Sequence, residues 1–450
     1  MTKKRKQKLI ELGPEVLATA LLELAVYSEA AAEVVERLSA TPDENYTRIR
    51  ERLSALQGLE HYYSWREIID FSRELGLLLQ DIRASVPEPT IGLSFVALFF
   101  EADASIFEHC DDSSGYVGDV FQEEAKDLFV YYGSQCADKQ QVAELILQLS
   151  LQDDYGVRNI LIDCAGEVLP KPVMYEMIAS LQQIVKEQTE SHDKRHFLYM
   201  IESLARQLKD ASLFEKTRTA TWGTLSAPAY LDIAEVYLES GDIDTALEWL
   251  DKVDEKESMH SSKRDELLLA AYKKQGDSQK TEAMLLKLFR SFRSLDALQD
   301  LLDVIGQDKR EAVIAKETVE ILASDRFQES DAYFLALIGA ADTAEEYLLK
   351  HADQIDGSYY GELLHIAEAL EKTDRPLALS LIYRSLLLSI LERGYAKAYS
   401  HGVRYLKKLD SLAMQITDWK NIPSHQAVKE QIKERHGRKR SFWSKYQGEV

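Results

Sequence analysis

Residues 229–253 read "AYLDIAEVYLESGDIDTALEWLDKV", and their pattern is the clearest indication of the architecture. Apolar residues recur at helical spacing on both sides of Gly241 and Asp242, which predicts two helices joined by a tight turn. Glycine reaches the left-handed backbone conformation that ends a helix at little cost, and small alanines let two antiparallel helices approach closely. The stretch therefore predicts a helix pair.

The same plan returns in "DELLLAAYKKQGDSQKTEAMLLKLF", residues 265–289, with its turn at Gly276. Weaker copies follow at 301–322, 332–349 and 363–387. Such repeats bury their apolar faces by stacking on their neighbours. The series resembles the tetratricopeptide repeat, which implies a right-handed solenoid of helix pairs. Irregular helices packed into a globule are the alternative.

Composition agrees with an all-α fold, because only 9 of the 450 residues are proline and 20 are glycine. Basic residues number 54 and acidic residues 76, which gives a formal net charge of −22. A charge of this sign repels nucleic acid backbones and anionic membranes. No apolar run is expected to approach the length that crosses a bilayer, so we expect no membrane association.

The sequence favours a cytoplasmic location. Glu11 and Pro14 interrupt the N-terminus before the apolar core of a secretory signal can form. Cys110, Cys136 and Cys164 are odd in number and far apart, as is typical of reduced thiols that pack in a protein interior.

Two proline pairs are the best segment boundaries, Pro87 with Pro89 and Pro170 with Pro172. They predict an irregular helical N-terminal half made of segments 1–88 and 89–171. The repeat array then covers 172–413. A capping helix and a basic aromatic tail occupy 414–450.

Several stretches resemble an uncharacterised bacterial family of helical-repeat proteins, a domain of unknown function. They are residues 9–25, 111–121, 367–410, 418–419 and 422–443. The resemblance implies no activity. Some relatives carry a SWIM-type zinc finger, but its CxC and CxH pairs do not occur in this sequence. We therefore expect neither this zinc site nor any other cofactor.

Two polar clusters are candidates for metal binding. The first, "EHCDDSSGYVGD", contains His109, Cys110 and Asp111, but its acids lack the spacing of a calcium loop. Its alternative role is to cap the following helix. The second, "HDKRH", places His192 and His196 on one helix face, without the adjacent glutamate that the hydrolytic motif requires. A solvated helix start explains it as well, so we assign no catalytic and no metal-binding residue.

Helical-repeat arrays commonly bind a partner segment along the first helix of each pair. Counting back from the turn glycines predicts a partner-binding face made of Leu231, Glu235, Leu238, Glu239, Glu266, Lys273 and Lys274. Its acidic rim and lysine pair suit a basic or mixed-charge peptide. A solvated helix face is the alternative.

The acidic chain ends in a basic, aromatic stretch, "ERHGRKRSFWSKY", residues 434–446. A terminal helix is expected from Ser424, as its N-cap, to Gly437. The exposed groups that could meet a partner are Arg438, Lys439, Arg440 and Trp443. They could dock on the protein's own acids as a cap, on a protein partner, or on phosphates and bases.

These observations favour a non-enzymatic, cytoplasmic scaffold that binds a protein or peptide. A nucleic-acid-associated factor is the alternative, which the net charge disfavours. A metal-dependent enzyme is the second alternative.

Overall fold

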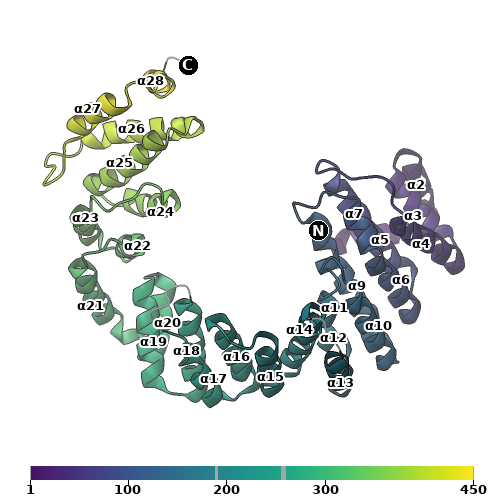
Figure 1. Cartoon of the computed structure of the whole chain (residues 1–450). Helices are drawn as coiled ribbons and strands as arrows, with labels where there is room; N and C mark the ends of the chain where they lie inside the picture. The colour runs from purple at the N-terminus through teal and green to yellow at the C-terminus, as the bar shows by residue number, and fades with distance from the viewer. Residues whose placement is uncertain (1, 188–190, 255–259, 449–450) are drawn as a thin grey trace. The chain divides into compact units, whose positions relative to one another are not determined.

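The computed structural model describes residues 2–187, 191–254 and 260–448; the side chains of residues 2–4, 29, 30, 33 and 191–193 lie outside the description. These ranges contain helices and no strand (Figure 1). An isolated parallel bridge joins Tyr63 to Cys110. The predicted all-α class is confirmed.

The chain divides into two compact units, residues 1–254 and 255–450. The division lies inside the predicted array 172–413. The first unit holds α1 to α17 and one π-helical turn, η1. Their bounds are α1 Thr2–Glu11, α2 Pro14–Tyr27, α3 Glu29–Ser39, α4 Pro42–Gln57, α5 Ile68–Ser85, α6 Pro89–Glu101, α7 Asp103–Glu108, α8 Tyr116–Val120, η1 Phe121–Ala125, α9 Lys126–Gln135, α10 Lys139–Leu151, α11 Ile160–Asp163, α12 Ala165–Val168, α13 Lys171–Glu187, α14 Ser191–Leu208, α15 Ala211–Trp222, α16 Ala227–Ser240 and α17 Ile243–Leu250.

The second unit holds α18 to α28 and two short 3-10 helices. Their bounds are α18 Ser261–Gln275, α19 Ser278–Ser291, α20 Leu295–Ile305, η2 Gln307–Lys309, α21 Arg310–Ala323, α22 Glu329–Leu337, α23 Ala341–Lys350, α24 Tyr360–Glu371, α25 Pro376–Arg393, η3 Ala396–Ala398, α26 Tyr399–Ala413, α27 His425–His436 and α28 Arg440–Gln447.

The proline pairs end helices where the sequence predicts. Helix α5 stops at Ser85 and α6 starts at Pro89, while α12 stops at Val168 and α13 starts at Lys171. The segments on both sides of each break share one apolar core, which runs from Ile49 to Leu208. The prolines therefore separate helices inside the first unit.

Residues 89–108 have the length and apolar composition of a membrane span, with a mean hydropathy of 1.5. The expectation that no apolar run approaches this length overlooked them, because Glu101 and Asp103 interrupt the pattern. In the structure they form two helices, α6 and α7, and more than half of the stretch is buried inside the protein. Asp103 is itself buried and paired with Arg158, whose Nε and Nη2 donate to it at 2.9 and 2.5 Å.

Helices α16 and α17, and helices α18 and α19, form the two predicted helix pairs. Gly241 and Gly276 end the first helix of each pair with φ of 93° and 72°. Asp242 and Asp277 then cap the second helices by accepting from the backbone amides three residues later. The turn chemistry predicted from the glycines is confirmed.

The core of the second unit is built around α25, which packs against α24 and α26. Residues along α25 are buried on nearly every side, from Leu377 to Leu391. Helix α28 then packs on α26 and buries Phe442 completely, with Gly402 so close that a Cβ there would lie 3.1 Å from the Phe442 ring. The C-terminal tail is thus part of the fold.

Candidate functional site

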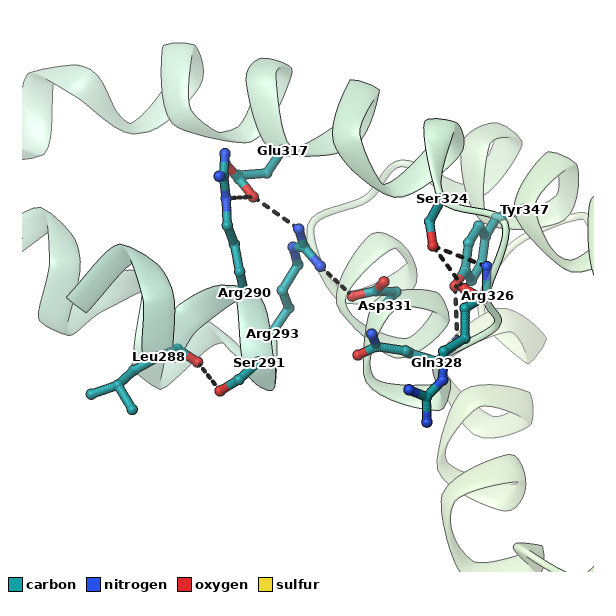
Figure 2. Close-up of polar contacts among 10 residues, drawn as sticks. All are labelled: Leu288, Arg290, Ser291, Arg293, Glu317, Ser324, Arg326, Gln328, Asp331 and Tyr347. Atoms are coloured by element: carbon teal, nitrogen blue, oxygen red, sulfur yellow. Dashed lines mark hydrogen bonds and ion pairs between the residues drawn. The ribbon is translucent and has the colours of Figure 1, made fainter. Parts of the chain in front are cut away.

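Four charged residues from separate elements form a buried ion network in the second unit. Arg293, in the link between α19 and α20, donates to Glu317 of α21 at 3.0 Å and to Asp331 of α22 at 2.9 Å. Arg290 of α19 grips the same Glu317 through Nε at 3.0 Å and Nη2 at 2.6 Å. Figure 2 shows Arg293 reaching toward both acids. The network fixes where α19 ends relative to α21 and α22.

The two acids respond differently to their surroundings. Burial raises the pKa of Glu317, but hydrogen bonds from Arg290 and Arg293 outweigh it, and the pKa lies below its ordinary value. Asp331 has Arg293 as its guanidinium partner, so burial prevails and the pKa lies above its ordinary value. Arg293 is therefore the group on which the ionised form of Asp331 depends.

The loop after α21 is held by hydrogen bonds to its backbone. The buried Tyr347 hydroxyl donates to the carbonyl of Arg326 at 3.2 Å and accepts from the amide of Gln328 at 2.9 Å. The amide of Phe327 donates to the side chain of Gln354 at 2.9 Å. Burial raises the pKa of Tyr347 to about 12, so it stays a neutral donor. These hydrogen bonds hold the backbone of the loop in one conformation. Figure 2 shows Tyr347 beside Arg326 and Gln328.

An aromatic groove lies beside this loop, with a volume of about 560 Å³. Phe292, next to Arg293, leaves the end of α19 with 67% of its surface exposed, and Tyr359, before α24, is 55% exposed. Tyr333 and His365 face each other with ring centroids 6.2 Å apart. The groove is lined by Ser291, Phe292, Arg326, Phe327, Gln328, Glu329, Ser330, Tyr333, Tyr359, Glu362 and His365.

The groove combines exposed rings with a slight excess of acid. Its charged lining residues are Arg326, Glu329 and Glu362. His365 also lines the groove. Aromatic side chains bury large area on binding, and an exposed ring held on a rigid frame loses little freedom when it does so. The arrangement suits an apolar side chain that is followed or preceded by a basic one.

The sequence did not point to this groove. Phe292 stands alone between two helices, and a single exposed aromatic residue carries no pattern. A usable signal was "DGSYYGE", residues 356–362, where two tyrosines follow a turn-forming Asp-Gly-Ser run. Paired aromatics in a turn are more typical of a surface than of a core.

The predicted partner-binding face is divided between the two units. In the first unit Leu231 and Leu238 are buried, whereas Glu239 is exposed and Glu235 half-buried. Arg206 Nη2 lies 3.4 Å from Glu235. The two leucines pack inside the protein and offer little surface to a partner. In the second unit the residues that remain on the surface are Glu266, Lys273 and Lys274.

The first polar cluster caps a helix, as its alternative role predicts. Asp112 accepts from the amides of Val117 and Gly118, both at 2.9 Å, at the start of α8. His109 Nδ1 lies 2.8 Å from the Ser105 carbonyl oxygen, and burial raises the pKa of the Cys110 thiol to about 11. Asp111 Oδ1 accepts only from the nearby amide of Ser113 in this loop, at 3.3 Å. The cluster is thus occupied with its own backbone.

The second cluster is described only in part, because the side chain of His192 lies outside the described residues. His196 Nε2 lies 3.0 Å from the Ser150 carbonyl oxygen. Across the described side chains no three His, Cys, Asp or Glu residues gather as they would around a metal ion.

The terminal helix predicted from Ser424 to Gly437 is confirmed as α27, and Ser424 caps it by accepting from the Ala427 amide. Arg438 and Arg440 are exposed and Lys439 is half-buried. Trp443 is half-buried, and its indole nitrogen donates to the His436 carbonyl at 3.0 Å. The tail aromatics are therefore packed, and its arginines are the groups left on the surface.

Two overlapping stretches, residues 2–227 and 215–445, match a protein family described as "Family of unknown function (DUF6880)". Together the matches cover nearly the whole chain, so the protein belongs to this family of unknown function. No curated protein matches it.

Proposed function

We propose that the protein is a non-enzymatic scaffold whose helix pairs form a right-handed, tetratricopeptide-like solenoid and which binds a protein or peptide. The aromatic groove is its binding site. The observation that carries the proposal is Phe292, a large ring left mostly exposed on a backbone that the ion network holds in place. Phe292 and Tyr359 are two exposed rings that line the same groove, and exposed apolar side chains gathered in one place are typical of an interaction site.

The charges of the groove select the partner's chemistry. Glu329 and Glu362 outnumber Arg326, so a basic side chain on the partner is attracted and an acidic one is repelled. The partner segment is accordingly an extended peptide with an apolar side chain beside a lysine or arginine. The three buried thiols, Cys110, Cys136 and Cys164, support placing the scaffold in the cytoplasm.

The test is a selection of random peptides on the purified full chain, followed by binding titrations of one selected peptide. The double variant Phe292→Ala with Tyr359→Ala is compared with Tyr395→Ala, which removes a ring of similar exposure, 57%, outside the groove lining. We expect selected peptides to share an apolar residue next to a basic one. We expect the double variant to bind at least about tenfold more weakly, and the control to bind like the wild type.

Two results would overturn the proposal. One is a selection that enriches no sequence. The other is a selected peptide whose affinity is unchanged in the double variant, because binding would then lie elsewhere on the chain.

A further inference from the structure

A cavity of the second unit lies between α23, α25 and α27, away from the aromatic groove. Its volume is about 1110 Å³. The loop after α23, residues 352–358, lines one side, and the link 420–423 before α27 lines another. Gly357 fits there only because it lacks a side chain, since a Cβ would lie 2.1 Å from the Ser385 carbonyl oxygen of α25. The cavity wall is therefore closely packed at this point.

Arg384 of α25 lines this cavity and is 94% buried, with 6% of its surface exposed. Its Nη1 donates to the carbonyl of Pro423 at 2.8 Å, and its guanidinium carbon lies 4.6 Å from the centre of the Trp419 ring. Its Nε and Nη2 have no hydrogen-bond partner, and none of the described carboxylates pairs with it. Burial alone lowers the pKa of Arg384, to about 10.

Arg384 differs from the other buried arginines that the structure describes, Arg158 and Arg293, because both of these bind carboxylates. Nε and Nη2 form one edge of the guanidinium, and buried Arg158 and half-buried Arg290 each bind a carboxylate through that edge. Arg158 grips Asp103 through these two atoms at 2.9 and 2.5 Å. Arg290 grips Glu317 through them at 3.0 and 2.6 Å. At Arg384 the same two-donor edge is present without an acid.

Leaving two buried donors without hydrogen bonds and a buried charge without a counter-charge is strongly unfavourable in a protein interior. An apolar side chain of the same length would avoid that cost. A cation kept under these conditions indicates a group that is supplied from outside the chain.

The other charges of the cavity favour an anion of low charge. Beside Arg384 its lysine and arginine lining residues are Lys350, Arg393, Lys420 and Arg435, and its acidic ones are Glu346, Asp353, Asp356 and Glu392. His436 also lines the cavity, and burial lowers its pKa, which favours the neutral imidazole. Asp356 is engaged with the amide of Ser358 at 2.8 Å, and Lys420 with Glu345 at 3.5 Å. The excess of one positive charge matches a single carboxylate better than a doubly charged phosphate.

We propose that this cavity binds a carboxylate ligand, anchored in two-donor fashion by the Nε and Nη2 edge of Arg384. The site is independent of the aromatic groove. Both atoms are buried, so the ligand reaches them when the 419–423 segment shifts outward. This segment places Trp419 beside the guanidinium and accepts the hydrogen bond from Nη1 of Arg384. The carboxylate belongs either to a small organic acid or to the C-terminus of a peptide, and both offer the same two oxygens.

The experiment measures thermal unfolding of the full chain with added carboxylates at constant ionic strength. One arm uses succinate and glutarate. A second uses tripeptides with a free C-terminus beside the same tripeptides as C-terminal amides. A third uses inorganic phosphate. The variants are Arg384→Met, Arg384→Lys and, as a matched control, Arg404→Met, which removes an exposed arginine of α26.

We expect at least one carboxylate arm to raise the unfolding temperature of the wild type and of Arg404→Met in a saturable way. In Arg384→Met the shift should disappear, while the ligand-free variant unfolds at the wild-type temperature or above it. Arg384→Lys keeps the positive charge but lacks the two-donor edge formed by Nε and Nη2. It should therefore bind the carboxylate at least about tenfold more weakly than the wild type. A response to free tripeptides but not to amides assigns a peptide terminus, and a response to the dicarboxylates assigns a small acid.

Three results would overturn the proposal. The first is that no carboxylate raises the unfolding temperature of the wild type. The second is that phosphate alone raises it. The third is that a carboxylate raises the unfolding temperature of Arg384→Met as much as that of the wild type. If Arg384→Met unfolds far below the wild type, Arg384→Lys decides: unchanged carboxylate affinity in that variant also overturns it.

Discussion

The ammonium nitrogen of Lys429 on α27 lies 2.6 Å from the carboxylate of Asp410 on α26. The same carboxylate accepts from the Tyr446 hydroxyl of α28 and lies 2.8 Å from Nε2 of His425. One acid of the body thus gathers three groups from the basic end of the chain. Arg438, Lys439 and Arg440 are not among these groups, so the three roles predicted for them stay predictions.

We predict that Asp410→Ala loosens α27 and α28 without unfolding the rest of the second unit. The substitution leaves the half-buried donors of Lys429 and Tyr446 without their charged acceptor, at a cost of about 1–3 kcal/mol. Hydrogen exchange of the backbone amides, followed by mass spectrometry, should show faster exchange in 425–447 and unchanged exchange in α22. Equal protection of α27 in both proteins would contradict the role of Asp410.

The same contact predicts a dependence on pH. Burial raises the pKa of Asp410, but hydrogen bonds from Lys429, Tyr446 and His425 outweigh it, so the pKa lies below its ordinary value of 3.8. A carboxyl group whose pKa is lower in the folded protein adds stability above its unfolded pKa, and this stability is lost as the pH falls through the folded value. Urea unfolding should therefore give a difference between wild type and Asp410→Asn near neutral pH that shrinks below pH 3.8. A difference that grows on acidification would contradict this assignment.

Phe442, and not Trp443, is the residue that anchors the tail. Phe442 is fully buried and meets the Tyr399 ring edge-on at 5.7 Å, whereas Trp443 keeps part of its surface exposed. We expect Phe442→Ala to cost about 3–5 kcal/mol, because it opens a cavity in a closed site. Trp443→Ala should cost less. Chemical unfolding of both variants measures the order, and a larger effect of Trp443→Ala would contradict it.

Arg293→Met should destabilise the second unit strongly, by about 3–5 kcal/mol, since it removes the partner of one buried acid and one of the two partners of another. Arg290→Met is the matched control: its side chain is 36% exposed, and Glu317 keeps Arg293. The two variants are compared by urea unfolding. Equal losses would mean that the network does not depend on its buried member.

Gly357→Ala tests the close approach of the cavity loop to α25. The new Cβ would meet the Ser385 carbonyl oxygen at 2.1 Å, which forces the loop or the helix to move and lowers the melting temperature. Gly361→Ala is the control, because it lies in α24 with open space around it and gains helix propensity. Both melting temperatures come from one calorimetric series. An unchanged melting temperature in Gly357→Ala would show that the loop or α25 can move apart at little cost.

Local features of the fold could be predicted from the sequence because they depend on neighbouring residues. The turn glycines, the proline breaks and the Ser424 cap each act within a few positions of the chain. The ion network could not be predicted, since it joins residues 290, 293, 317 and 331 in a chain with 76 acids, where carboxylates near arginines occur by chance. The burial of Phe442 could not be predicted either, because it depends on how the short helix α28 packs against Gly402 of α26.

Arg384 could have been noticed. It is a lone charge in the apolar run "PLALSLIYRSLLLSIL", residues 376–391, where a helix buried on nearly every side leaves it no route to water. The sequence of this helix shows that a charged residue lies among apolar ones. It does not show whether an acid pairs with Arg384, because that depends on residues far away in the chain.

The shared arginine of the ion network limits how this family can diverge. A substitution of Arg293 alone removes a hydrogen-bond donor from two buried acids, Glu317 and Asp331. A substitution of Asp331 alone leaves one donor of Arg293 without an acceptor. Each single step is unfavourable, although a fully apolar replacement of the set need not be. Positions 290, 293, 317 and 331 are therefore expected to be inherited together or exchanged together, and to leave a correlated signature across related genomes.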